Sequence, residues 1–134
     1  MKKAVWLAIL ALALGTYGKA EVDADFQANM KAIAAANASL RKNVEAKMGA
    51  ESAADAKKIS ELFGKVKEHF DAKQSHAAMM AADAQAGFAK VAEVAATGNM
   101  EGTAEALKTA GAACGACHTA HREKAADGSY TIKY

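Results

Sequence analysis

The sequence predicts an all-α protein, an antiparallel four-helix bundle. Of its 134 residues 37 are alanine and none is proline, which are the best and the worst residues for a helix interior. Apolar residues recur at steps of three and four along four segments, so each segment would bury one stripe. The connections between these segments are short, and short connections make neighbouring helices antiparallel.

Residues 1–20 are expected to be a secretory signal peptide rather than part of the fold. Lys2 and Lys3 precede an apolar run, and the small residues Gly18 and Ala20 follow it, as at signal-peptidase sites. The run is shorter than the roughly 20 apolar residues of a spanning helix, so no stable membrane insertion is expected after cleavage. The predicted domain is therefore residues 21–134, and its predicted location is the periplasm.

Removal of this signal changes the charge balance. The full chain has 17 Lys and Arg against 15 Asp and Glu. Three lysines and no acidic residue lie within the signal, so the remaining domain has one acidic residue more than basic ones. Such a domain offers no basic patch of the kind that binds nucleic acid.

The first two helices are predicted at residues 22–48 and 52–71. Gly49 would cap the first, and Ser52 would open the second as part of a capping box. The first stripe consists of Phe26, Met30, Ile33, Leu40 and Val44, with Asn37 on the same face. The second consists of Ile59, Leu62, Phe63, Val66 and Phe70.

The other two helices are predicted at residues 75–97 and 100–125. Ser75 would be the N-cap of the third, and Thr97 to Asn99 would end it and begin the fourth. The third stripe consists of Met79 or Met80, Ala84, Phe88, Val91 and Ala95, and the fourth of Leu107, Gly111, Cys114, His118 and His121. Residues 127–134 would leave the helix at Gly128 and either fold back along the bundle or fray.

The two cysteines of the chain lie together in Cys114-Gly115-Ala116-Cys117-His118. This spacing fits a redox dithiol, part of a zinc site, or covalent attachment of haem c. On a helix Cys114, Cys117 and His118 share one face, so the thiols could bond two haem vinyl groups while the imidazole reaches the iron.

The rest of the chain favours haem among these three chemistries. A zinc site needs four ligands, and the sequence has no second pair of suitable spacing. A redox dithiol usually follows a strand in a βαβ unit, and no strand is predicted. We therefore expect one haem c per chain, with His118 as an axial iron ligand; a disulfide or redox pair is the alternative.

These features together resemble the cytochrome c-prime family, the class II cytochromes c. The resemblance rests on the signal peptide, the four helices and the motif "CGACHTAHR" in the last helix. It implies that the haem packs inside the bundle, and it suggests a homodimer. It also implies that Arg122 is the basic residue often found beside the proximal histidine, although a surface cation near a helix C-terminus is an equal interpretation.

The second axial position of the iron separates two possible functions. The resemblance puts Met30 where family members carry either a ligating methionine or an apolar residue. Ligation by Met30 would raise the reduction potential and suit an electron carrier. If Met30 only fills the core, as methionine commonly does, the open iron would bind NO or CO. Phe26, one turn earlier, would form a wall on this side of the haem.

Other side chains are less favoured as iron ligands. His76, Met79 and Met80 are the remaining alternatives for the second position, although the two adjacent methionines are expected in the core. His69 and His121 are expected to be solvated. We therefore expect a one-electron carrier between periplasmic redox partners, with a gas-binding haem protein as the alternative. No catalytic triad or pair of carboxylates indicates an enzyme.

Overall fold

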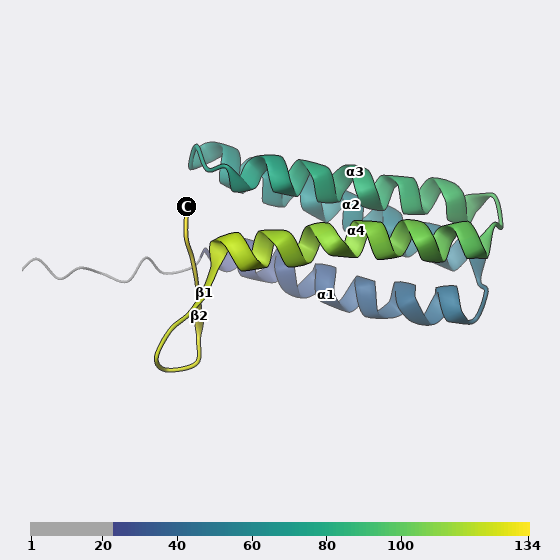
Figure 1. Cartoon of the computed structure of the whole chain (residues 1–134), viewed down its shortest axis with the longest axis horizontal. Helices are drawn as coiled ribbons and strands as arrows, with labels where there is room; N and C mark the ends of the chain where they lie inside the picture. Colours follow the sequence, from purple (N-terminus) through teal and green to yellow (C-terminus); the bar gives the residue numbers. More distant parts are fainter. Residues whose placement is uncertain (1–22) are drawn as a thin grey trace, which may run out of the picture.

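The computed structural model describes residues 23–134 and is a four-helix bundle with a β-hairpin at its C-terminus (Figure 1). The elements are α1 (Ala24–Glu45), α2 (Gly49–Ala72), α3 (Ala77–Ala96), α4 (Met100–His121), β1 (Arg122–Lys124) and β2 (Tyr130–Ile132). The prediction of a four-helix bundle is thereby confirmed. The predicted signal peptide, residues 1–20, lies outside the described residues. Within those residues, no helix combines the length and apolar character that crossing a membrane requires.

Each helix packs against the next one in the chain. The contacts are extensive between α1 and α2, between α2 and α3, and between α3 and α4, whereas α1 and α4 scarcely touch. Figure 1 shows the start of α1, the end of α4 and the hairpin at the same end of the bundle. The side between α1 and α4 is therefore less closely packed than the other three.

The predicted apolar stripes meet in one core. Leu40, Ile59, Phe88 and Val91 are fully buried there, and the ring of Phe63 stacks on that of Phe88 with 5.8 Å between centroids. Small residues let the helices approach closely. A Cβ on Gly87 of α3 would lie 3.2 Å from the Cβ of Ala110 on α4, so any larger side chain would push these helices apart.

The connection between α1 and α2 differs from the prediction. Gly49 does not cap α1 but begins α2, while Lys47 takes the left-handed conformation at φ 57°. A Cβ at Gly49 would lie 3.1 Å from the Ala95 carbonyl oxygen, so glycine is needed there for packing against α3. The predicted capping box is also wrong, because Ser52 is inside α2 and fully buried.

The boundaries of α3 lie close to the predicted ones. The helix begins at Ala77 after His76 as the N-cap residue, although the Ser75 hydroxyl does accept the Ala77 N–H at 3.2 Å. Gly98, with φ 79°, follows its end. Asn99 then caps α4 as predicted, and its side-chain oxygen accepts the Gly102 N–H at 2.9 Å.

The end of α4 was predicted four residues too late. The helix ends at His121, and Arg122 is already extended and pairs with Ile132 in an antiparallel hairpin. Gly128, with φ 85°, lies in the turn of this hairpin. The partly buried Ile132 packs against the core, so burial holds the tail in place and it does not fray.

Candidate functional site

A cleft of about 540 Å³ lies at the hairpin end of the bundle, between α1 and α4. This volume is within the range of roughly 300–1,000 Å³ that is usual for ligand pockets. Its inner surface is mainly apolar and comes from three helices: Ile33 on α1, Phe63, Val66 and Phe70 on α2, and Ala81 and Ala84 on α3. The cleft exists because α1 and α4 scarcely touch while both pack against their other neighbours.

The α4 wall of the cleft carries the cysteine motif. Cys114, Cys117 and His118 all line it and are half-buried, as expected for three residues on one helix face. The Cys114 thiol makes a weak hydrogen bond to the Ala110 carbonyl at 3.9 Å, and neither cysteine is in a disulfide. Gly115 lies between them on the exposed side, with no atom within 4 Å of where a Cβ would be.

The cleft changes the acid–base behaviour of these three groups. Burial raises the pKa of both thiols, so at neutral pH they are protonated. Burial lowers the pKa of His118, and the positive charge of Arg122 lowers it further. The imidazole is therefore neutral at neutral pH, which is the form that binds a metal ion.

The α1 wall of the cleft carries Phe26 and Met30. Phe26 is held from behind by two rings of α2, with centroid distances of 4.7 Å to His69 and 5.4 Å to Phe70. Both side chains are half-buried, so both are available to a molecule in the cleft. The structure thus brings the predicted residues of the first and fourth helices to opposite walls of one cleft.

Arg122 lies at the outer rim of this cleft. Its guanidinium is placed over the Tyr130 ring, 4.1 Å from the centroid, and the residue itself is exposed. The rim is polar: Gln27 and Lys31 come from α1, and Arg122, Ser129 and Thr131 come from the C-terminal segment. An apolar interior with a charged rim suits a molecule that is mostly apolar and has polar groups at one edge.

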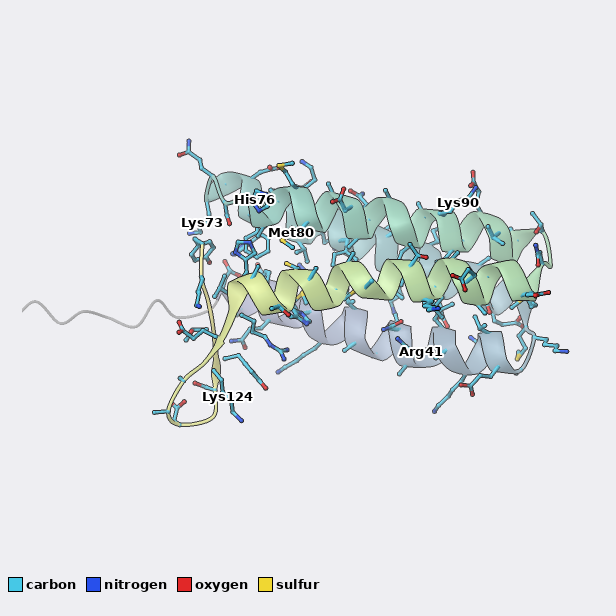
Figure 2. All side chains as sticks on the ribbon, viewed as in Figure 1. Arg41, Lys73, His76, Met80, Lys90 and Lys124 are labelled. Atoms are coloured by element: carbon cyan, nitrogen blue, oxygen red, sulfur yellow. The ribbon has the colours of Figure 1, made fainter. Side chains whose placement is uncertain are left out.

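The other candidate iron ligands differ in whether they line the cleft. Met80 lines the cleft, and Figure 2 shows its side chain on the side of α3 that faces α4. Met79 is 65% exposed, so the prediction that it belongs to the core is wrong. His76 is exposed and does not line the cleft, although its ring lies 6.3 Å from that of His121.

His69 and His121, which are expected to be solvated rather than iron ligands, are both half-buried. His121 lines the cleft, and its Nδ1 donates to the Lys133 carbonyl oxygen at 2.8 Å. His69 shares a hydrogen bond of 3.2 Å with the Tyr134 hydroxyl. The hairpin therefore fixes both histidines, a role that helical periodicity could not have indicated.

The structure adds cleft residues that the sequence pattern did not single out. These are the hairpin residues from Ser129 to Ile132. Among residues 23–134, no three His, Cys, Asp or Glu side chains converge to hold a metal ion.

Comparisons with protein families, with curated proteins and with solved structures found no match to this chain.

Proposed function

We propose that this protein is a c-type cytochrome, similar to the cytochrome c-prime family, that carries one electron between redox partners in the periplasm. One haem c would be attached to Cys114 and Cys117, with His118 as axial iron ligand. What supports the proposal most is a single observation: these three residues line one apolar cleft whose opposite wall carries Phe26 and Met30.

The cleft fits such a group in size and in chemistry. Its two thiols are free and on the same wall, and each could add across a vinyl double bond, with sulfur joining one carbon and hydrogen the other. The neutral imidazole of His118 would bind the iron from the same helix. Arg122 and Lys31 at the rim would pair with the haem carboxylates, which prefer cationic partners near water.

The haem iron, when bound, takes up or releases one electron as it changes between the ferric and ferrous states. The chain would supply the surroundings of this change. The buried side chains of Phe63, Val66 and Phe70 exclude water from the side of the cleft that faces the core. A site with little water and few mobile dipoles reorganises little when its charge changes, which favours rapid electron transfer.

The second axial ligand decides between this function and gas binding. Met30 and Met80 both line the cleft, from α1 and α3 respectively, so two thioethers are candidates. We propose Met30 as the ligand, because it belongs to the wall opposite His118. If neither methionine binds, the iron keeps an open position and the protein would bind CO or NO.

Absorption spectra of the protein expressed in the periplasm test this proposal. A reduced spectrum in pyridine, recorded after acid–acetone extraction, would show haem that stays with the chain. We expect low-spin bands in both redox states and no change with CO. Met30→Ala should convert the iron to high-spin, open it to CO and lower the reduction potential.

Met80→Ala is the matched control, since it removes the thioether that α3 contributes to the same cleft. It should leave the low-spin bands in place. High-spin bands in the parent protein that shift with CO would favour gas binding over electron transfer as its function. Haem that is lost on extraction, or that still attaches when both cysteines are replaced by alanine, would overturn the proposal.

A further inference from the structure

Asn37 has a polar atom in the cleft that the proposed function does not use. The residue lies two helical turns beyond Met30 on the same face of α1, and it lines the cleft. Its side-chain oxygen is buried, and no residue among 23–134 forms a hydrogen bond with it. Buried polar atoms in folded proteins almost always have a partner, so the partner of this one is to be sought in the cleft.

The position of Asn37 differs from that of the other polar residues on this wall. Gln27 and Lys31 are exposed at the rim, whereas Asn37 is half-buried. Arg41, one turn further along α1, has its guanidinium 3.7 Å from the Cβ position of Gly111 on α4. This part of α1 therefore lies alongside the α4 turn that leads to the first cysteine, at the inner end of the cleft.

Two other residues show why Asn37 stands apart. Asn43, also on α1, uses its amide structurally and donates to the Asp55 carboxylate at 2.9 Å. Ser52 has the other buried oxygen without a partner, but it lies inside α2 and does not line the cleft. Unlike Asn43, Asn37 has no structural partner for its side-chain oxygen among the described residues. Unlike Ser52, it lines the cleft. Its amide is available to a molecule in the cleft.

We propose that the Asn37 amide contacts a small polar ligand, of the class of CO, NO or water, held between the cofactor and α1. This inference rests on the haem attachment of the proposed function and not on Met30 as an iron ligand, since it applies where Met30 leaves the position open. Rotation of the amide exchanges its oxygen and nitrogen, so it can accept a hydrogen bond from water or donate one to CO or NO. The cleft around it is mainly apolar, and a hydrogen bond is stronger in such surroundings than in water.

This contact would give the α1 side of the cleft a preference for polar ligands. A wall of alanine and isoleucine alone would admit any small gas without distinguishing among them. An amide at the inner end would hold a ligand that can hydrogen-bond, and it would slow the escape of that ligand.

Carbon monoxide is the probe, used on the haem-loaded protein with Met30→Ala so that the iron is open whether or not Met30 is its ligand. In this background Asn37→Leu keeps the volume of the side chain and removes the amide. The C–O stretching frequency of the ferrous complex should rise, because a donated hydrogen bond lowers it. The dissociation of CO should become roughly fivefold faster, as expected for the loss of one hydrogen bond.

Two further variants separate this contact from a general effect on the helix. Asn29→Leu makes the same change on α1 at a half-buried position outside the cleft, and it should alter neither the frequency nor the rate. Asn37→Ala cannot clash with its neighbours and should reproduce the effect of the leucine variant.

The outcomes distinguish the two proposals. A haem-loaded Asn37→Leu or Asn37→Ala protein with an unchanged stretching frequency and dissociation rate would overturn the inference and leave the proposed function standing. A chain without covalently attached haem would overturn the proposed function, and the inference with it.

Discussion

The immediate surroundings of the two thiols and the imidazole favour their uncharged forms still further. Burial raises the pKa of Cys114 and Cys117 and lowers that of His118, because each group loses water that would stabilise its charge. Ser52 is a polar group that loses water on burial and gains no hydrogen bond in exchange. Its hydroxyl oxygen is fully buried in α2 and has no hydrogen-bond partner among the described residues.

Replacing this serine should stabilise the protein. A buried polar group without a partner costs roughly 1–3 kcal/mol, and alanine is the better helix former. We expect Ser52→Ala to raise the free energy of unfolding by about 1 kcal/mol, measured by urea denaturation followed by circular dichroism.

Ser60→Ala is the matched control on the same helix. The Ser60 hydroxyl donates to the Gln85 carbonyl at 2.9 Å, so its removal should lower the stability by about 1 kcal/mol. A destabilised Ser52→Ala variant would mean that the hydroxyl has a favourable contact in solution.

The hairpin is the element that completes the cleft. It adds Ser129 to Ile132 to the lining, and Lys133 is bonded through its backbone to both the backbone and the ring of His121. Tyr134 at its end reaches His69 on α2. The hairpin therefore links the end of α4 to α2 across the open end of the bundle.

The hairpin turn should loosen in acid. The Asp127 carboxylate accepts hydrogen bonds from the Ser129 hydroxyl and backbone N–H, and these hold the pKa of Asp127 below its usual value. Because the folded pKa is the lower one, this stabilisation is fully present above the unfolded value of about 3.9 and is lost as the pH falls through the folded pKa.

Nuclear magnetic resonance of the Ser129 amide between pH 6 and pH 2 would follow this change. We expect one titration step with a midpoint below about 3.9, the value for an unperturbed aspartate. Asp127→Asn keeps an acceptor that does not titrate, so its Ser129 amide should move much less. A midpoint at or above the unperturbed value would contradict the hydrogen-bonded turn.

The bundle as a whole is closed on three sides by helix packing and on the fourth only in part. The side between α1 and α4 has few direct contacts, and the cleft lies there. A haem in this cleft would contact both helices and provide apolar contact that the many alanines do not. Without such a haem the bundle would keep a cavity or collapse, and either would reduce its stability.

If the proposed haem is bound, its removal should therefore loosen α1 first. We expect a haem-free Cys114→Ala, Cys117→Ala variant to show amide exchange in residues 26–37 at least about tenfold faster than the holoprotein, or about 1.4 kcal/mol of opening free energy. Residues near Phe88 should stay protected longest, because α3 packs extensively on both its neighbours.

Hydrogen exchange with mass spectrometry would measure this, with thermal melting followed by circular dichroism beside it. The opposite outcome is a haem-free chain that melts as cooperatively as the holoprotein and shows the same amide protection along α1. This result would contradict the idea that the cofactor joins α1 to α4.

The sequence was sufficient for the parts that depend on local periodicity. Alanine content and stripes such as Ile59, Phe63, Val66 and Phe70 predicted the helices, since helix formation and amphipathic burial are set by residues three and four apart. The spacing of Cys114, Cys117 and His118 predicted one shared helix face for the same reason. The cap at Asn99 was also predictable, because a cap is formed by residues adjacent in the chain.

Packing between distant segments decided the rest. Gly49 is the first residue of α2, and glycine is needed there because a Cβ would meet the Ala95 carbonyl of α3. After His121 the chain pairs in a hairpin with residues that follow in the chain, and Ile132 of this hairpin packs against the core. The cleft itself, with Met30, Asn37 and Met80 around the cysteine motif, exists only where α1 fails to close on α4. Contacts of this kind join residues far apart in the chain, and no local pattern records them.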